Sequence, residues 1–212
     1  MSLAFAQGPV VWREDFAYTD AASINGVGGW IAPGVSGDIA MGVATGALQR
    51  TTGSGWSAAI TGHQGFGRTP GFDITFDIAA PPDSTNQLFC QVLAGGNGVG
   101  TTGYVANIKQ AVSANSQWKL QRFAAGSVAA THVDVTDAVL AAGDAIGIRV
   151  LPGTVALWRR LSGTWAQVGG TATDTTLTAG TIAVETNAGA TRIDAITVRR
   201  TEPILVLVGC GA

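Results

Sequence analysis

Pairs of carboxylates are the first candidates for chemistry in this sequence, because two acids that flank a glycosidic bond can hydrolyse it. Such enzymes hold their two carboxyl groups roughly 5–9.5 Å apart. Glu14 and Asp15 are neighbours, so on a strand their side chains would point to opposite faces. Asp73 and Asp77 would share a face, but four residues of strand separate them by about 13 Å. Neither pair has the required spacing, and we therefore expect no enzyme. A catalytic pair made of two acids from different strands is left open.

The sequence gives little support for a catalytic nucleophile or for a bound metal ion. The chain has two histidines, His63 and His132, and no Gly-x-Ser-x-Gly motif that would present a nucleophilic serine. Neither histidine lies at metal-ligand spacing from a second ligand, which argues against zinc. Calcium needs only oxygen ligands, so Asp38, Asp134 and Asp137 are its candidates, but no loop has EF-hand-like spacing. We therefore expect no cofactor and leave calcium open.

Six tryptophans suggest sugar binding, because an aromatic ring stacks on the apolar face of a pyranose. Trp56 and Trp118 are the surface candidates, and the four expected in the core are Trp12, Trp30, Trp158 and Trp165. Trp118 shares a strand face with Leu120 and Arg122, and Tyr104 lies on the preceding strand. We predict a carbohydrate-binding patch of Tyr104, Trp118 and Arg122, with Trp56. The alternative is core packing with Arg122 at the edge.

Short strands separated by turns must position these residues. The region 142–200 contains five apolar runs, closed by turns such as Pro152-Gly153, Ser162-Gly163 and Gly169-Gly170. Turns at this spacing of about 8–12 residues are typical of a β-sandwich. The run 72–79 alternates apolar and polar residues, so one face of it should be core. We predict an all-β protein, a two-sheet antiparallel β-sandwich, in which only 135–140 could hold a short helical turn.

Composition narrows the function classes. Charged residues make up 12% of the 212-residue chain, against roughly 25% in an average globular protein. Such a surface suits a protein packed in an assembly or one facing the extracellular environment. The net charge of −2 provides no basic surface for nucleic acid. No apolar run approaches the ~18 residues of a membrane span.

The two ends of the chain differ in character from the middle. We divide the chain into an N-terminal arm (1–9), a β-sandwich domain (10–200) and an apolar tail (201–212). The arm lacks the basic and apolar regions of a secretion signal. An apolar segment of the tail should either extend its own sheet or pair with another subunit, which we favour; its residues are Ile204, Leu205, Val206, Leu207 and Val208. A disulfide between Cys90 and Cys210 is left open.

Several motifs resemble one superfamily. They begin with Glu14-Asp15-Phe16 and Gly29-Trp30; the later ones are Gly143-Asp144, Trp158-Arg159, Trp165, Thr173-Asp174-Thr175 and Arg192-Ile193-Asp194. The chain resembles the concanavalin A-like lectin/glucanase superfamily in its LamG-like form, and is similar to modules of bacteriophage tail proteins. The resemblance implies a jelly-roll sandwich with a curved face that often binds carbohydrate. The Glu-x-Asp-x-x-Glu motif of the related hydrolases is absent.

The main prediction for function follows from this resemblance. We predict a non-enzymatic bacteriophage virion protein, tail-associated or on the capsid surface, that acts in particle assembly or binds host-surface carbohydrate. Its expected partners are other virion proteins or its own copies in a homo-oligomer, and its location is the virion or the extracellular space. The alternative is an extracellular glycoside hydrolase or carbohydrate-binding module of the same superfamily. A bacterial surface adhesion domain is a third possibility.

Overall fold

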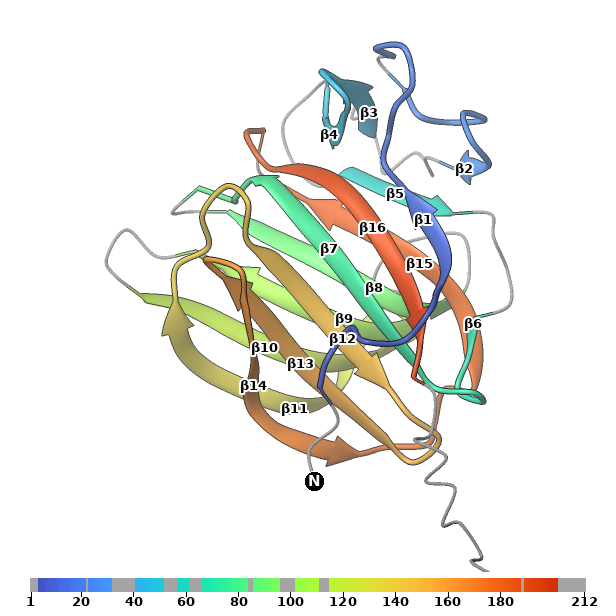
Figure 1. The fold of residues 1–212 in the computed structure, drawn as a ribbon, viewed down its shortest axis with the longest axis vertical. Helices are drawn as coiled ribbons and strands as arrows, with labels where there is room; N and C mark the ends of the chain where they lie inside the picture. Colours follow the sequence, from blue (N-terminus) through green and yellow to red (C-terminus); the bar gives the residue numbers. More distant parts are fainter. Residues whose placement is uncertain are drawn as a thin grey trace, which may run out of the picture.

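Two antiparallel sheets packed face to face form the molecule (Figure 1). The computed structural model describes residues 4–21, 23–31, 41–51, 57–61, 66–83, 86–95, 102–110, 115–187 and 189–201. Within these ranges there are 16 strands and no helix, so no helix that could cross a membrane is found there. The prediction of an all-β sandwich is confirmed.

We name the two layers sheet A, in front in Figure 1, and sheet B, behind it. Sheet A has the order β14 (Thr164–Thr173), β13 (Thr154–Leu161), β12 (Ala145–Val150), β7 (Phe72–Ala80), β16 (Arg192–Arg200), β4 (Ala47–Arg50) and β3 (Met41–Ala44), and β1 (Val10–Glu14) also pairs with β16. Sheet B has the order β11 (Ser127–Ala138), β10 (Asn115–Ala124), β9 (Thr102–Lys109), β8 (Gln87–Gly95), β15 (Ala179–Thr186), β5 (Ser57–Thr61) and β2 (Trp30–Ile31), and β6 (Phe66–Gly67) pairs with β15.

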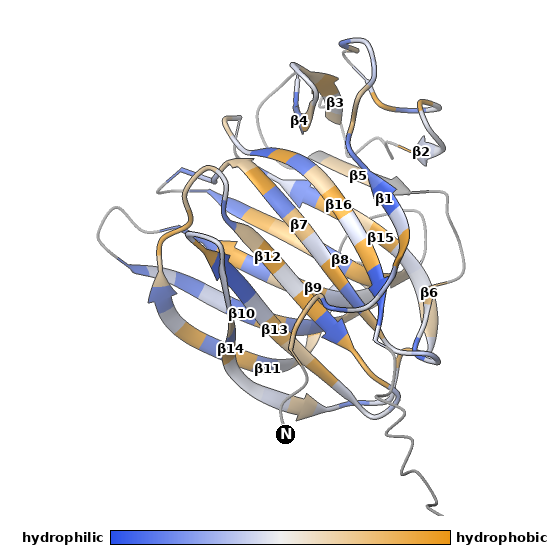
Figure 2. Ribbon diagram, viewed as in Figure 1, coloured by the Kyte–Doolittle hydropathy of each residue, from blue (hydrophilic) through white to orange (hydrophobic). Residues whose placement is uncertain are grey.

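The core lies between the inner faces of the two sheets. Strand β7 shows the rule, since Phe72, Ile74, Phe76 and Ile78 all belong to the main buried cluster. Successive side chains of a strand point to opposite faces, so every second residue enters the core. Figure 2 shows the resulting alternation of hydrophobic and hydrophilic colour along the strands. The alternation read from 72–79 therefore identifies the inner face correctly.

Two local predictions are wrong. Residues 135–138 continue strand β11 rather than forming a helical turn, because Val135 and Thr136 pair with Trp118 and Gln117 of β10. Gly169-Gly170 does not end a strand either, since β14 runs on to Thr173. The pairing of β13 with β14 shifts register at this point, and Gly169 has a φ of 66°. A glycine in this conformation accommodates a β-bulge, which bends the strand but does not end it.

Candidate functional site

The structure brings together two residues of the predicted sugar-binding patch, but not at the surface. Tyr104 and Arg122 are direct cross-strand partners on β9 and β10, whereas Trp118 pairs with Ile108 further along. Tyr104 and Trp118 are both fully buried, and the indole Nε1 of Trp118 donates to the carbonyl of Ala138 (2.9 Å). Neither ring offers a face to a ligand, so the expectation of a surface position for Trp118 is wrong. Trp56, like the segment 204–208, lies outside the described residues.

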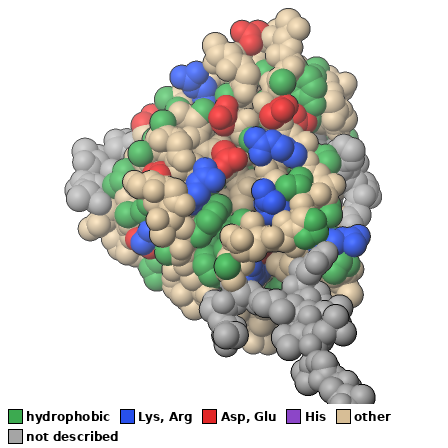
Figure 3. All heavy atoms as spheres, viewed as in Figure 1, with side chains coloured by type: hydrophobic (Ala, Val, Ile, Leu, Met, Phe, Trp, Pro, Cys, Tyr) green, Lys and Arg blue, Asp and Glu red, His purple; other side chains and the backbone are tan. Residues whose placement is uncertain are grey.

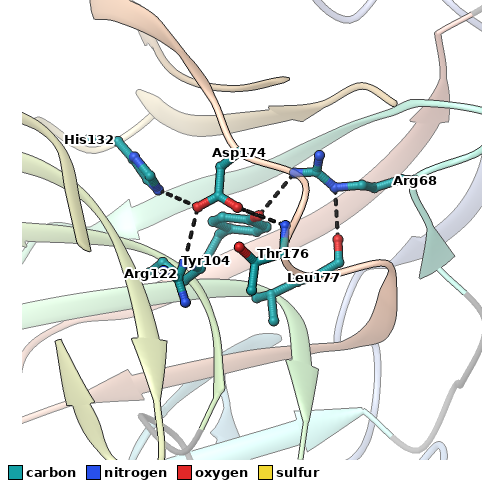
Figure 4. A network of polar contacts seen from close by, with 7 residues as sticks. All are labelled: Arg68, Tyr104, Arg122, His132, Asp174, Thr176 and Leu177. Carbon is teal, nitrogen blue, oxygen red and sulfur yellow. Dashed lines mark hydrogen bonds and ion pairs between the residues drawn. The ribbon is translucent and has the colours of Figure 1, made fainter. Parts of the chain in front are cut away.

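Tyr104 instead belongs to a network around the carboxylate of Asp174 (Figure 4). The Tyr104 hydroxyl donates to Asp174 Oδ1 (2.8 Å) and accepts from Arg68 Nη2 (3.0 Å). Arg122 Nε donates to Asp174 Oδ2 (3.0 Å). His132 Nε2 lies 2.9 Å from the same oxygen as a close contact, without the alignment of a hydrogen bond. One carboxylate in the connection between β14 and β15 thus gathers side chains from three strands of sheet B, β9, β10 and β11.

This network is structural rather than an accessible site. Burial alone would raise the pKa of Asp174, but hydrogen bonds from Thr176 and Tyr104 and the charge of Arg122 outweigh it and hold that pKa well below its usual range. Burial and the hydrogen bond to Asp174 raise the pKa of Tyr104 to about 12. Asp174 and Arg68 are both buried. At neutral pH the charged carboxylate therefore fixes the connection between β14 and β15 to the interior of sheet B.

The outer face of sheet B carries a different set of side chains. Along one cross-strand row, Glu185 faces Phe89, Phe89 faces Asn107, and Asn107 faces Lys119. No described strand packs over this face (Figure 1). Even so, Val105 in the next row is fully buried. The face is thus sheltered although it is the outside of the sandwich.

Two phenylalanine rings cover the middle of this face. Phe89 belongs to β8 and Phe123 to β10, and β9 lies between them. Phe89 aligns with Asn107 of β9 and Phe123 with Gly103 of β9, so their backbones are about 9.5 Å apart across the strands and are also offset by four residues along them. The two ring centroids are nevertheless only 6.1 Å apart. The rings must therefore lean toward each other across β9, the strand that carries Val105. Their interplanar angle is 51°, so they form a tilted aromatic floor rather than a stack.

Amide side chains flank the aromatic floor. Asn107 Nδ2 donates to Gln121 Oε1 (3.3 Å), and Gln121 Nε2 donates to Thr131 Oγ1 (3.4 Å). This row leaves the buried Oδ1 of Asn107 without a hydrogen-bond partner among the described residues. A buried acceptor without a partner costs free energy, and a hydroxyl of a ligand would satisfy it.

Glu185 is the second polar group on this face without a partner among the described residues. The residue is only 8% exposed, and its side chain makes no hydrogen bond or ion pair with any described residue. Burial raises the pKa of this carboxyl to about 7. Near neutral pH it can therefore either donate or accept a hydrogen bond. The face combines two aromatic rings with two polar groups that have no hydrogen-bond partner in the described part of the chain.

Sequence reasoning missed this face because it followed the opposite one. The inner face of β10 carries Trp118, while Lys119 and Gln121 alternate with it and point outward. On β8, Phe89 likewise alternates with the inner residues Leu88 and Cys90 and points outward. The signal in the sequence is a phenylalanine that alternates with amide side chains on the same face of a strand: Phe89 with Gln87 and Gln91 on β8, and Phe123 with Gln121 and Gln117 on β10.

Comparison with solved structures identifies the fold. A protein with a galectin-like fold from Bacillus subtilis matches with a TM-score of 0.64 at 12% identity, over 93% of this chain and 98% of its own. A legume lectin-like domain from Entamoeba histolytica matches with a TM-score of 0.57 at 13% identity, over 82% and 91%. The fold is the concanavalin A-like jelly roll. This confirms the structural part of the resemblance read from the sequence.

The fold by itself leaves the activity open. A β-1,3-1,4-glucanase from a mouse hindgut metagenome is also similar, with a TM-score of 0.55 at 12% identity, over 89% of this chain and 98% of its own. The carbohydrate-binding module CBM66 from Bacillus subtilis gives a TM-score of 0.54 at 14% identity, over 81% and 92%. No protein-family model and no curated protein matches the sequence. The jelly roll thus serves both enzymes and binding proteins, and only the site can separate them.

The described residues contain no cluster of three His, Cys, Asp or Glu side chains that could hold a metal ion. Of the calcium candidates, Asp134 contacts Lys119 (3.3 Å) and Asp137 contacts Arg159 (2.9 Å). Asp38 lies outside the described residues. The two placed acids are thus engaged with cationic side chains.

Proposed function

We propose that this protein is a non-catalytic carbohydrate-binding module whose ligand lies on the outer face of sheet B. The observation that carries the proposal is the pair of rings, Phe89 and Phe123, that meet across β9. The apolar face of a pyranose can rest on such an aromatic floor. Its hydroxyls would then reach the unpaired Oδ1 of Asn107 and the carboxyl of Glu185, which flank Phe89 in the same row.

The distribution of acids supports binding rather than hydrolysis. On the outer face of sheet B the described strands carry two carboxyls, Glu185 on β15 and Asp134 on β11. Four strand spacings separate β15 from β11, which is about 19 Å and well beyond the roughly 5–9.5 Å of a glycosidase pair. Outside the described residues the sequence has two further acids, Asp38 and Glu202. Glu185 thus acts in this proposal as a hydrogen-bonding group for the sugar.

The test is binding to a glycan array, followed by calorimetry with the glycan that binds. Phe89→Ala should weaken binding by about tenfold or more, since stacking and buried aromatic contacts are worth about 1–2 kcal/mol. Phe5→Ala is the matched control, because Phe5 is a buried phenylalanine on the opposite outer face, that of sheet A. Unchanged affinity in Phe89→Ala, or no glycan bound by the unmodified chain, would refute the proposal.

The biological setting in a bacteriophage virion remains part of the proposal. It rests on the resemblance of the 142–200 motifs and on the low content of charged residues, 12%. Detection of the chain in purified virions by mass spectrometry is the test. Its absence from such particles would favour an extracellular binding module with the same ligand face.

A further inference from the structure

The segment just before β1 lies across the outer face of sheet A, opposite the proposed glycan face. The Phe5 ring stacks on Trp158 (centroids 5.0 Å apart, interplanar angle 22°) and lies 4.5 Å from the ring of Trp165. Gly147 makes room for it, because a Cβ there would lie 2.5 Å from Phe5 Cζ. The result is an aromatic socket on β12, β13 and β14 that almost completely buries Phe5.

An ion pair in the same socket binds the main chain on both sides of Phe5. Ala6 N donates to Asp73 Oδ2 (2.7 Å), and Arg149 Nη2 donates to the carbonyl of Ala4 (2.9 Å). Arg149 also holds Asp73 through two hydrogen bonds of 2.7 and 2.8 Å. We call Asp73, Gly147, Arg149, Trp158 and Trp165 the arm socket. It recognises an extended segment by its backbone and one aromatic side chain, so the same segment from a second molecule would fit equally well.

The hinge of this arm is short and strained. Ala6 has a φ of 59°, a conformation that costs free energy for a residue with a Cβ. Immediately after Gln7 the chain is fixed to β16: Arg199 Nη1 donates to the carbonyl of Gly8 (3.1 Å) and Arg200 N donates to that of Pro9 (3.0 Å). The part that can leave the socket therefore ends at Gln7. Short hinges under strain favour exchange of a terminal segment between copies.

The surface beside the hinge also suits a second copy. Val10 and Val11 are 47% and 44% exposed and follow the hinge on β1, an edge strand of sheet A. Figure 3 views this face and shows basic, acidic and hydrophobic side chains interspersed over it. Such a mixed surface can match itself across a two-fold axis, where the same patch is used by both subunits.

We propose that two copies of this chain dimerise by exchanging their N-terminal arms, so that Phe5 of each enters the arm socket of the other. Every contact of the arm with the socket is the same in the monomer and in the dimer. The equilibrium between monomer and dimer therefore depends on two favourable terms, relief of the strain at Ala6 and new contacts of Val10 and Val11. These terms must outweigh the entropy lost on association. The hinge, from Ala6 in the socket to Gly8 on β16, spans about 10 Å at most. The outer faces of the two A sheets must therefore meet.

Deletion of Gln7 is the decisive experiment. A shorter hinge should prevent the arm from reaching its own socket while still allowing it to reach a neighbour's. Light scattering after size-exclusion chromatography should show the unmodified chain shifting from monomer to dimer as its concentration rises. The Gln7 deletion should be dimeric at concentrations where the unmodified chain is still a monomer.

The control combines the Gln7 deletion with Phe5→Ala. This variant should return to a monomer, because its arm has lost the aromatic side chain that fills the socket. Far-UV circular dichroism shows whether each variant keeps the sandwich. A Gln7 deletion that folds but stays monomeric would overturn the proposal. A dimer that survives Phe5→Ala would also overturn it, because the copies would then be joined elsewhere.

Discussion

Two buried acids in this molecule show that the pKa of a carboxyl group depends on its hydrogen-bond and charge partners as well as on its burial. Asp174 is surrounded by donors from Tyr104, Thr176 and Arg122, and its pKa is held well below the usual range despite burial. Glu185 is buried without such partners, and its pKa rises to about 7. Desolvation penalises a charge unless hydrogen bonds or opposite charges compensate it. Asp174 is therefore a structural group, whereas Glu185 is the group that we propose to bind a sugar hydroxyl.

The raised pKa of Glu185 predicts a specific pH dependence of stability. The folded-state pKa of about 7 lies above the ordinary 4.5, so the native state binds more protons between these values. The free energy of unfolding should then fall as pH rises through this window, by up to about 3 kcal/mol. In urea unfolding at a series of pH values, the unfolding free energy of Glu185→Gln should not fall over this pH window.

Asp194→Asn is the control for that measurement, because Asp194 is an exposed acid on β16. Its unfolding free energy should follow that of the unmodified chain at every pH. If Glu185→Gln and Asp194→Asn gave the same pH profile, the buried carboxyl would not be the source of the dependence.

At the scale of elements, the connection between β14 and β15 is held by one carboxylate. Asp174→Ala would leave Arg122 and the hydroxyl of Tyr104 without this acceptor in a buried position. Breaking a buried charge network by removing one partner costs about 3–5 kcal/mol. We expect a loss of this size in the free energy of unfolding measured by denaturant titration.

Asp137→Ala provides the comparison, since Asp137 forms a more exposed ion pair with Arg159 (side chains 23% and 23% exposed). Pairs of that kind contribute about 0–1 kcal/mol. A loss for Asp174→Ala no larger than that for Asp137→Ala would show that the network around Asp174 does not hold the connection.

Element by element, the sequence predicted inner faces better than outer ones. Alternation identified the core side of β7, because that side depends only on local pattern. The outer side of β12 could not be predicted in this way, since Arg149 and Gly147 are covered by an arm more than 130 residues earlier in the chain. The same limit applies to the site: the meeting of Phe89 and Phe123 depends on the order β8-β9-β10, which no local motif records.

At the scale of the whole molecule, early and late strands are interleaved in both sheets. β16 lies between β7 and β4 in sheet A, and β15 lies between β8 and β5 in sheet B. The turn spacing in 142–200 predicted the strands of this half and the sandwich class correctly, but not this interleaving, because pairing partners are set by tertiary packing. The interleaving also decides whether either half of the chain can fold by itself.

A chain divided in the turn after β11 tests this dependence. The fragment 1–141 would contain β7 and β4 without β16, and β8 and β5 without β15, so both sheets would be split through the middle. Their core faces would then be open to water, and too little apolar surface would be buried to offset the conformational entropy of folding. We expect neither 1–141 nor 142–212 to show a cooperative thermal transition by circular dichroism, and the mixture to regain one. A second fragment with Ile196→Asp, which places a charge at a fully buried position of β16, should fail to reconstitute the fold. Cooperative unfolding of 1–141 alone would contradict the prediction, because it would mean that the early strands close a core without the late ones.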